Sequence, residues 1–201
     1  MIFKEKQVQE NLNSAVDSKI STSKIERLRV CTLSDKMQEL LLRQLKHELQ
    51  NHNIYRTFAN FFGTQGLAVL EEYYRLRAEE EKLHHDWIAN YLNECDAVYS
   101  YPEIPAVKYE LNDNIVPFQL TVDKEIETTM LIYEMVDLAQ EEKDWRTWKW
   151  LMGDDNESGR LVAEQIEEET ISRTALDIAE SDGSWLRKEK SIMNAYKNDN
   201  D

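Results

Sequence analysis

Residues that interrupt helices are scarce in this sequence. It contains only 5 Gly and 3 Pro among 201 residues, and all three prolines lie between residues 94 and 118. The abundant residues are instead helix formers such as Glu, Leu, Lys, Gln and Ala. This composition predicts an all-α protein with long helices.

Cysteine is also rare, and long apolar runs are absent. The two cysteines, Cys31 and Cys95, form no framework pattern, which is typical of reduced thiols in a cytosolic protein. The N-terminal residues MIFKEKQVQE lack the apolar run of a signal peptide, and no segment reaches transmembrane length. We therefore expect a cytoplasmic protein without a membrane partner.

Positive charge is in deficit. Lys and Arg number 24 against 39 Asp and Glu, which gives a net charge of −15. This excess of negative charge argues against a nucleic-acid partner and against anionic membrane surfaces. It suits a chain that handles cations, although acidity by itself mostly favours solubility.

The length of the chain is most simply that of one bundle domain with a segment on either side. Hydrophobic periodicity separates these three parts. Residues 1–31 are polar and are interpreted as an N-terminal extension, residues 32–182 form the bundle, and residues 183–201 form a short C-terminal helix and an acidic tail. Within the bundle, apolar stripes and capping residues predict helices near residues 35–62, 67–92, 119–142 and 145–180, the last interrupted at residues 153–159.

The predicted connection between the second and third helices is unusually long. Residues 94–118 lack periodicity, and so long an irregular segment is uncommon inside a compact domain. A four-helix bundle needs such a segment when its second and third helices run parallel, because the chain must then cross the full length of the bundle. We therefore predict a long crossover at this point.

Charged residues interrupt the apolar stripe of the second predicted helix. That stripe consists of Leu70, Tyr73, Tyr74, Arg77, Glu81, His84 and Ile88. Glu81 and His84 share a face because they are three residues apart, and Glu80 is one position away. A carboxylate and an imidazole that converge in this way form half of a metal site. A solvated acidic face with an incidental histidine is the alternative, and it is the commoner meaning of an isolated E-x-x-H motif.

The other three helices each offer an inward carboxylate. Glu48 lies within the stripe of the first helix, although an exposed edge position is the alternative, and Tyr55 follows two turns later on the same face. Glu125 shares the apolar stripe of the third helix, whereas Glu127 falls outside it. The fourth helix has a face formed by Glu164, Gln165 and Glu168, with Glu167 beside it. Buried carboxylates are rare unless they are paired or bound to metal, so four together favour a di-metal site.

Three segments carry a resemblance to a known family. Residues 45–54 (LKHELQNHNI), 144–151 (DWRTWKWL) and 162–169 (VAEQIEEE) resemble stretches of the non-haem bacterial ferritins, and Glu81 and His84 fall at that family's separation from Glu48. The resemblance covers roughly residues 33–180. It implies a ferritin-like four-helix bundle.

The resemblance also implies roles for individual residues. A first iron would be held by Glu48, Glu81 and His84. Glu81 would bridge to a second iron held by Glu125, with Gln165 and Glu168 nearby. An accessory third iron would be held by Glu80, Glu164, Glu167 and Glu168. Tyr55 would donate an electron during oxygen reduction. Gln165 stands where bacterioferritins have a second ligating histidine motif, which favours the non-haem branch. No methionine is placed after the E-x-x-H motif to ligate a haem, so no haem is expected.

The function that the resemblance implies is iron storage. Fe(II) would be oxidised to Fe(III) by O2 or H2O2 at the di-iron centre and mineralised inside a homo-oligomeric shell of 24 subunits. Alternatives are a rubrerythrin-type di-iron oxidase or peroxidase and a non-catalytic helical shell or interaction protein. Five aromatic residues are interpreted as core more than interface, so they support a shell only weakly: Trp145, Trp148, Trp150, Tyr73 and Tyr74. Residues 153–159 (GDDNESG) depart from the family, and we favour a bulged loop over two added helical turns.

Overall fold

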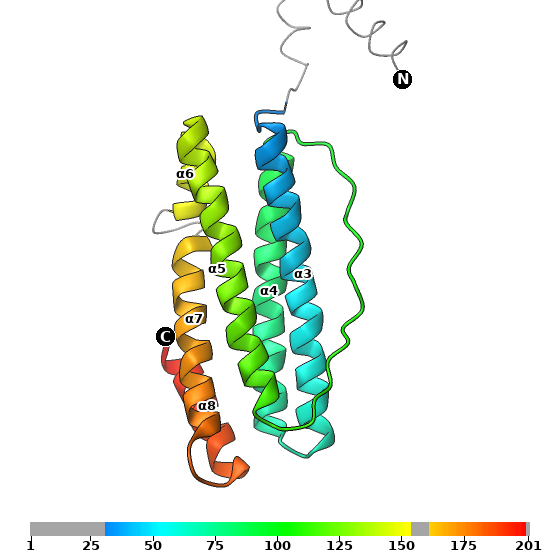
Figure 1. Ribbon diagram of the computed structural model, residues 1–201, viewed down its shortest axis with the longest axis vertical. Helices are drawn as coiled ribbons and strands as arrows, with labels where there is room; N and C mark the ends of the chain where they lie inside the picture. Colours follow the sequence, from blue (N-terminus) through cyan, green and yellow to red (C-terminus); the bar gives the residue numbers. More distant parts are fainter. Residues whose placement is uncertain (1–30, 154–160, 200–201) are drawn as a thin grey trace, which may run out of the picture.

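Helices account for most of the protein. The computed structural model describes residues 31–153 and 161–199. Its helices are α3 (Asp35–Thr64), α4 (Ala68–Glu94), α5 (Val116–Glu142), α6 (Trp145–Met152), α7 (Leu161–Glu180) and α8 (Trp185–Asp199). No β-strand occurs in these two ranges, and the predicted all-α class and bundle are confirmed (Figure 1).

Local sequence signals explain where the helices begin and end. Ser34 caps α3, since its Oγ accepts a hydrogen bond from the Met37 N–H at 3.0 Å. Asp144 caps α6 in the same way, accepting from the Thr147 N–H at 3.0 Å. The chain turns between α3 and α4 at Gly66, whose φ of +74° suits a residue without a Cβ.

The predicted crossover joins the end of α4 to the start of α5. Figure 1 shows this connection running along the length of the bundle, so that α4 and α5 point the same way. One detail of the prediction was wrong, because α5 begins at Val116 and already contains Pro117. A proline is tolerated in the first helical turn, where its missing N–H would have no partner in any case.

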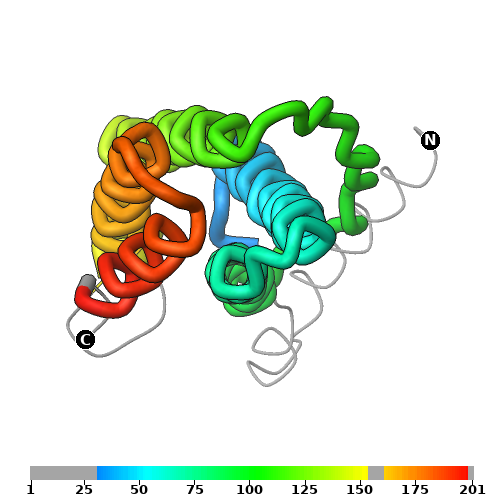
Figure 2. The backbone as a smooth tube through the Cα atoms, turned by 90° about the horizontal axis from the view of Figure 1, so that it is seen from below, coloured from blue at the N-terminus to red at the C-terminus, as the bar shows by residue number. Residues whose placement is uncertain are grey.

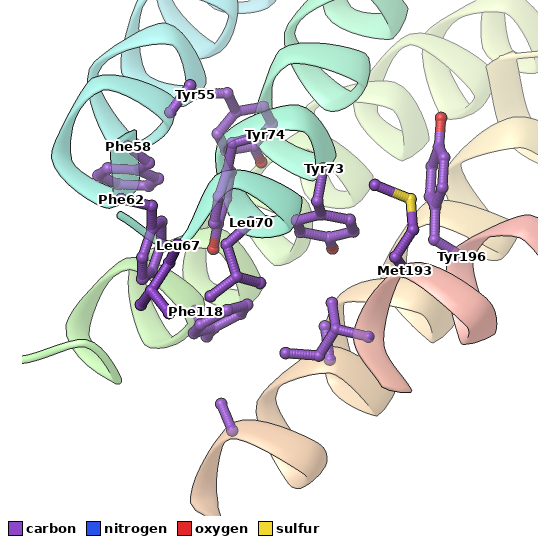
Figure 3. Packing of buried hydrophobic residues seen from close by; sticks show 14 of the residues in the cluster. Tyr55, Phe58, Phe62, Leu67, Leu70, Tyr73, Tyr74, Phe118, Met193 and Tyr196 are labelled. Carbon is purple, nitrogen blue, oxygen red and sulfur yellow. The ribbon is translucent and has the colours of Figure 1, made fainter. Parts of the chain in front are cut away.

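Two apolar clusters fill the bundle, one towards each end. One is rich in aromatic rings, among which Phe62 and Tyr74 stack with centroids 5.5 Å apart (Figure 3). The other includes Leu41, Leu45 and Leu92. Polar residues of α3 and α4 lie between the clusters in sequence, so the bundle has a buried polar layer at its middle.

The tryptophans of α6 do not behave alike. Trp145 is 61% exposed, so its interpretation as a core residue was wrong, whereas Trp148 and Trp150 are partly buried. The reason is the shortness of α6, which buries only Thr147 and Leu151. An eight-residue helix that rests on the bundle by one narrow face leaves its first residue in solvent.

The last helix folds back onto the bundle. Figure 2 shows α8 beside α7 and close to α4. The Val69 N–H donates to Glu189 Oε2 at 3.2 Å, and the Tyr73 and Tyr196 rings meet edge to face at 5.6 Å. The predicted C-terminal helix is therefore present and continues to Asp199.

The interruption of the fourth bundle helix begins at Gly153. Its φ of 72° and ψ of 169° are not helical, so α6 ends there and α7 resumes by Leu161. The choice between a bulge and added helical turns concerns residues 154–159, which lie outside the described residues, as does most of the predicted extension. Among the helices of the described ranges, none combines the length and apolarity that a membrane crossing requires.

Candidate metal centre

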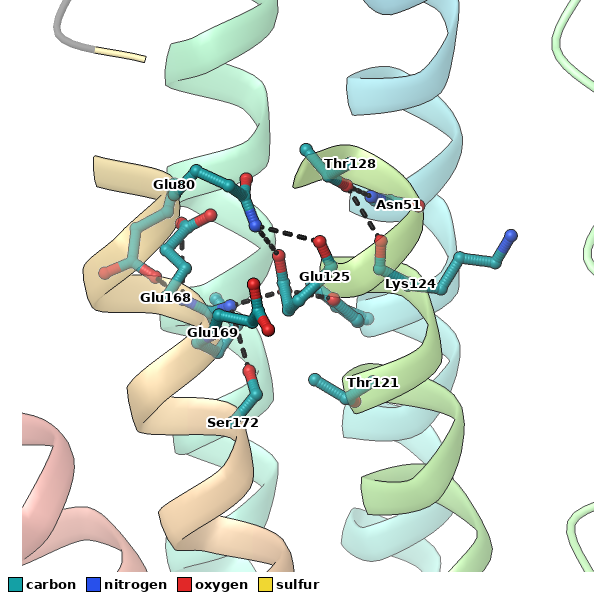
Figure 4. Close-up of polar contacts among 12 residues, drawn as sticks. Asn51, Glu80, Thr121, Lys124, Glu125, Thr128, Glu168, Glu169 and Ser172 are labelled. Atoms are coloured by element: carbon teal, nitrogen blue, oxygen red, sulfur yellow. Dashed lines mark hydrogen bonds and ion pairs between the residues drawn. The ribbon is translucent and has the colours of Figure 1, made fainter. Parts of the chain in front are cut away.

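The polar layer between the two apolar clusters brings together side chains from four helices. It contains Glu48 from α3, four residues of α4, Glu125 from α5, and Gln165 and Glu168 from α7. The α4 residues at this level are Arg77, Glu80, Glu81 and His84. Apart from Glu80, which is partly buried, all of them are 5% exposed or less. Figure 4 shows Glu125 and Glu168 extending into the same interior space from α5 and α7.

Two groups of potential ligand atoms share one residue. Glu48, Glu81 and His84 offer ligand atoms that lie within 4.8 Å of one another, and so do Glu81, Glu125 and Glu168. Glu81 therefore stands between two three-residue groups. Such a carboxylate can bridge two metal ions, which is the arrangement found in four-helix di-metal carboxylate proteins.

The first group contains carboxylate oxygens that have no hydrogen-bond partner. Neither oxygen of Glu81 has a donor group as its partner, nor has Glu48 Oε2, although the two carboxyl groups lie close enough to share a proton. The second oxygen of Glu48 accepts from Gln44 Nε2 at 2.6 Å. A buried carboxylate without a partner is costly, and a bound cation is the usual way in which proteins compensate for it.

Burial shifts the ionisation of this first group. Desolvation raises the pKa of Glu48 to about 7, and desolvation with the neighbouring carboxylates raises the pKa of Glu81 well above its usual value. Burial lowers the pKa of His84 to about 3, with the charge of Arg77 adding to the effect. His84 is thus a neutral imidazole, the form that ligates metals. Oxygen and imidazole donors of this kind suit iron.

In the second group, Glu125 is already bonded through both of its oxygens. Glu125 Oε1 accepts from Tyr55 Oη at 2.5 Å and from Arg77 Nη2 at 2.6 Å, while Glu125 Oε2 accepts from Gln165 Nε2 at 3.0 Å. Burial, followed by the charge of Glu125, raises the pKa of the Tyr55 phenol well above its usual value. Tyr55 therefore remains a proton donor to Glu125 at neutral pH.

Arg77 is the residue whose role the sequence analysis missed. Its side chain is 0% exposed and pairs with Glu125, with Glu168 at 3.2 Å and with Glu80 at 3.0 Å. Burial disfavours its charge, but Glu168, Glu125 and Glu80 together raise the pKa of Arg77, so it stays cationic. A signal was present in the sequence, because Arg77 lies on the same inward stripe as Glu81.

The residues expected to form an accessory iron site line one pocket. This pocket of about 150 Å³ is bordered by Glu80, Glu164, Glu167 and Glu168, together with His84 and Arg77. Glu167 is exposed and Glu164 half-buried, whereas His84 and Glu168 are buried. The pocket thus leads from the surface to the edge of the buried centre. Among the described residues, the close ligand groups do not include Glu80, Glu164 or Glu167.

A second set of polar residues joins α3 to its neighbours and was also missed. His47 Nε2 lies 2.8 Å from Thr128 Oγ1. Asn51 Nδ2 lies 3.2 Å from the same His47 nitrogen and 3.3 Å from the Thr128 hydroxyl. His85 Nδ1 lies 3.0 Å from the Leu45 carbonyl oxygen of α3. These contacts hold α3 in register with α4 and α5, which sets the relative height of Glu48.

Comparison with known proteins agrees with this geometry. The family described as "Ferritin-like domain" matches residues 38–178. A bacterial non-heme ferritin of Staphylococcus saprophyticus is 27% identical over 145 residues, which cover 72% of this chain and 83% of the relative. A counterpart from Staphylococcus aureus (strain USA300) is 25% identical over 145 residues, with the same coverage of 72% and 83%.

Solved structures show the same likeness in three dimensions. A humanized archaeal ferritin superposes with a TM-score of 0.73 at 25% identity, covering 81% of this chain and 96% of that one. Chlorobium tepidum ferritin superposes with a TM-score of 0.70 at 25% identity, covering 83% and 96%. Because the family match spans most of the chain and includes all four bundle helices, this protein belongs to the ferritin-like domain family.

Proposed function

We propose that this protein oxidises Fe(II) to Fe(III) at the buried carboxylate and histidine centre and stores the product. The observation that carries the proposal is Glu81, which belongs to both ligand groups and has two unpaired oxygens although it is only 1% exposed. A site that leaves such a group uncompensated is suited to receive cations.

The chemistry needs two Fe(II) ions and an oxidant. Two Fe(II) ions release two electrons, which reduce O2 with two protons to H2O2; with H2O2 as oxidant, the same two electrons and two protons yield two water molecules. Glu48, Glu81 and His84 would bind the first iron, and Glu81 with Glu125 and Glu168 the second. Glu81 can hold both ions at once, so both electrons are available to a single oxidant molecule.

The protein's own groups support the transfer of electrons and protons. Tyr55 donates its phenolic hydrogen to Glu125 at 2.5 Å, so an electron leaving the ring could be accompanied by proton transfer to that carboxylate. We assign Tyr55 this donor role. The pocket bordered by Glu164 and Glu167 offers Fe(II) a carboxylate-lined route to His84 and Glu168, and an accessory iron would be held there by Glu80, Glu164, Glu167 and Glu168.

Storage requires assembly of several subunits. The relatives are named ferritins, and we propose that this chain likewise forms a homo-oligomeric shell, of 24 subunits by family resemblance, in which Fe(III) mineralises. Sedimentation of the purified protein tests this point separately from catalysis. A monomer or dimer that still oxidised iron would favour the di-iron oxidase alternative.

The test of the catalytic proposal is aerobic Fe(II) oxidation followed by absorbance in a matched pair of variants. Glu81→Gln keeps the side-chain volume but removes the bridging carboxylate, and rapid oxidation should be lost. Glu79→Gln makes the same change at an exposed position two residues away and should leave the rate unchanged. Equal rates in wild type and Glu81→Gln would refute the proposal, and absence of iron binding in wild type would favour a non-catalytic shell.

A further inference from the structure

The two halves of the centre are not equivalent. In the first half, both oxygens of Glu81 and one oxygen of Glu48 have no partner. In the second half, both oxygens of Glu125 are bonded, to Tyr55 and Arg77 on one side and to Gln165 on the other. One oxygen of Glu168 is paired with Arg77, and its other oxygen has no partner. A metal ion can therefore enter the first half without breaking any of these contacts, whereas an ion that binds Glu125 must replace them.

Arg77 supplies the second half with a fixed positive charge. Its two terminal nitrogens reach Glu125 at 2.6 Å and Glu168 at 3.2 Å, the same two carboxylates that would complete the ligand group of Glu81. The guanidinium carbon also lies 5.8 Å from the centre of the Tyr55 ring. Arginine remains charged under all ordinary conditions, so this neutralisation does not depend on pH.

A second metal ion would meet this charge at close range. An ion coordinated by Glu125 Oε1 at roughly 2 Å would lie within about 5 Å of Arg77 Nη2. At that separation two positive charges repel strongly in a site from which water is excluded. Binding at Glu125 therefore requires the guanidinium to withdraw or the ion to accept weaker coordination.

We propose that Arg77 occupies the place of the second cation and makes metal loading sequential. The inference rests on the proposed iron-oxidising function, because it concerns how the same centre takes up its two irons. The first Fe(II) binds tightly to Glu48, Glu81 and His84. The second binds weakly, because it competes with Arg77 for Glu125 and Glu168.

The surroundings of Arg77 offer a place for the displaced guanidinium. Its Nη1 already contacts Glu80 at 3.0 Å, and Ser172 Oγ lies 3.5 Å from Nη2. Glu80 and Arg77 both border the carboxylate-lined pocket. A shift towards the pocket would keep the pair with Glu80 and release Glu125 and Glu168. Arg77 is thus a positioning residue that sets the Fe(II) concentration at which the pair of irons forms.

Anaerobic calorimetric titration with Fe(II) tests this proposal without relying on oxidation. Wild type should show one tight binding event per chain and a second at least tenfold weaker. Arg77→Gln removes the competing charge, so the ratio of the two dissociation constants should fall at least tenfold. The matched control is Arg75→Gln, which makes the same change on the same helix at an exposed side chain that pairs with Glu71. This control should keep the wild-type ratio.

Several results would overturn the proposal. Two equally tight events in wild type would do so, and so would an unchanged ratio in Arg77→Gln. If Arg77→Gln does not fold, Arg77→Lys retains the charge on a single nitrogen, which cannot span Glu125 and Glu168 as a guanidinium does, and its ratio should still fall. Sequential binding in wild type without aerobic oxidation would refute the proposed function but support this inference. No binding at all would refute both.

Discussion

The Tyr196 hydroxyl donates a hydrogen bond of 2.6 Å to Glu80 Oε1, which ties the last helix to the edge of the metal centre. The other oxygen of Glu80, Oε2, accepts a hydrogen bond from Arg77 Nη1. Tyr196 is 8% exposed, so this contact is largely protected from water. Helix α8 therefore touches the charge network around Arg77 as well as covering α7 and part of α4.

Replacing Tyr196 by Phe should loosen this attachment. The ring contact with Tyr73 would be kept, while the hydrogen bond to Glu80 would be lost, and we expect the free energy of unfolding to fall by about 1 kcal/mol. Urea denaturation measures the change. Tyr133→Phe, at a position 48% exposed on α5, is the control and should have no effect. An equal loss in both variants would contradict the importance of the Glu80 contact.

The two proposed ligands of the E-x-x-H motif, Glu81 and His84, should differ in their effect on oxidation. Glu81→Ala removes a group that serves both irons and should abolish rapid oxidation. His84→Ala removes one ligand of one iron and should slow oxidation without abolishing it, so its loss of rate should be smaller than that of Glu81→Ala. Stopped-flow oxidation rates provide the comparison, and circular dichroism checks that the helices persist. A larger loss in His84→Ala than in Glu81→Ala would contradict the bridging role of Glu81.

The buried His47 predicts a pH dependence of stability. Burial lowers its pKa from 6.5 to about 4, so the unfolded chain binds a proton more readily than the folded one does. The stabilisation is complete above pH 6.5 and is lost as the pH falls towards 4. For a shift of this size the change is about 3 kcal/mol.

The variant that isolates this contribution is His47→Gln. Between pH 7 and pH 4 the free energy of unfolding should fall by about 3 kcal/mol less in this variant than in wild type. Any cost of the substitution that does not depend on pH cancels in this comparison. His52→Gln provides the comparison, since His52 is only partly buried. If wild type and His47→Gln gave parallel pH profiles, His47 would not be the source.

Residues 153–159 should be dispensable for folding. If they form a bulge, joining Met152 directly to Arg160 should give a metal-binding protein with a nearly unchanged melting temperature. If the segment adds helical turns, the deletion would draw α6 along the bundle, and Thr147 would lose its contact with Tyr91. A thermal melt that fell sharply would rule out the bulge.

Helical periodicity alone was enough to place several candidate ligands in the interior. Glu48, Glu81, His84 and Glu125 are all buried as their stripes predicted, because the direction of a helical side chain is fixed by local geometry. A cap at the start of the first bundle helix was predictable for the same reason, since a cap involves only the next few residues. The length of residues 94–118 likewise predicted the crossover, because so long an irregular segment has few other roles in a compact domain.

Tertiary structure decided which of these inward groups meet, and with what partner. Arg77 finds Glu125 and Glu168 at sequence separations of 48 and 91 residues, and no local pattern encodes the distance between two helices. Tyr196 reaches Glu80 across 116 residues for the same reason. The sequence determined the faces of the helices and the types of ligand they carry. Only the packing of α4 against α5, α7 and α8 determined that one half of the centre is open while the other is occupied by a guanidinium.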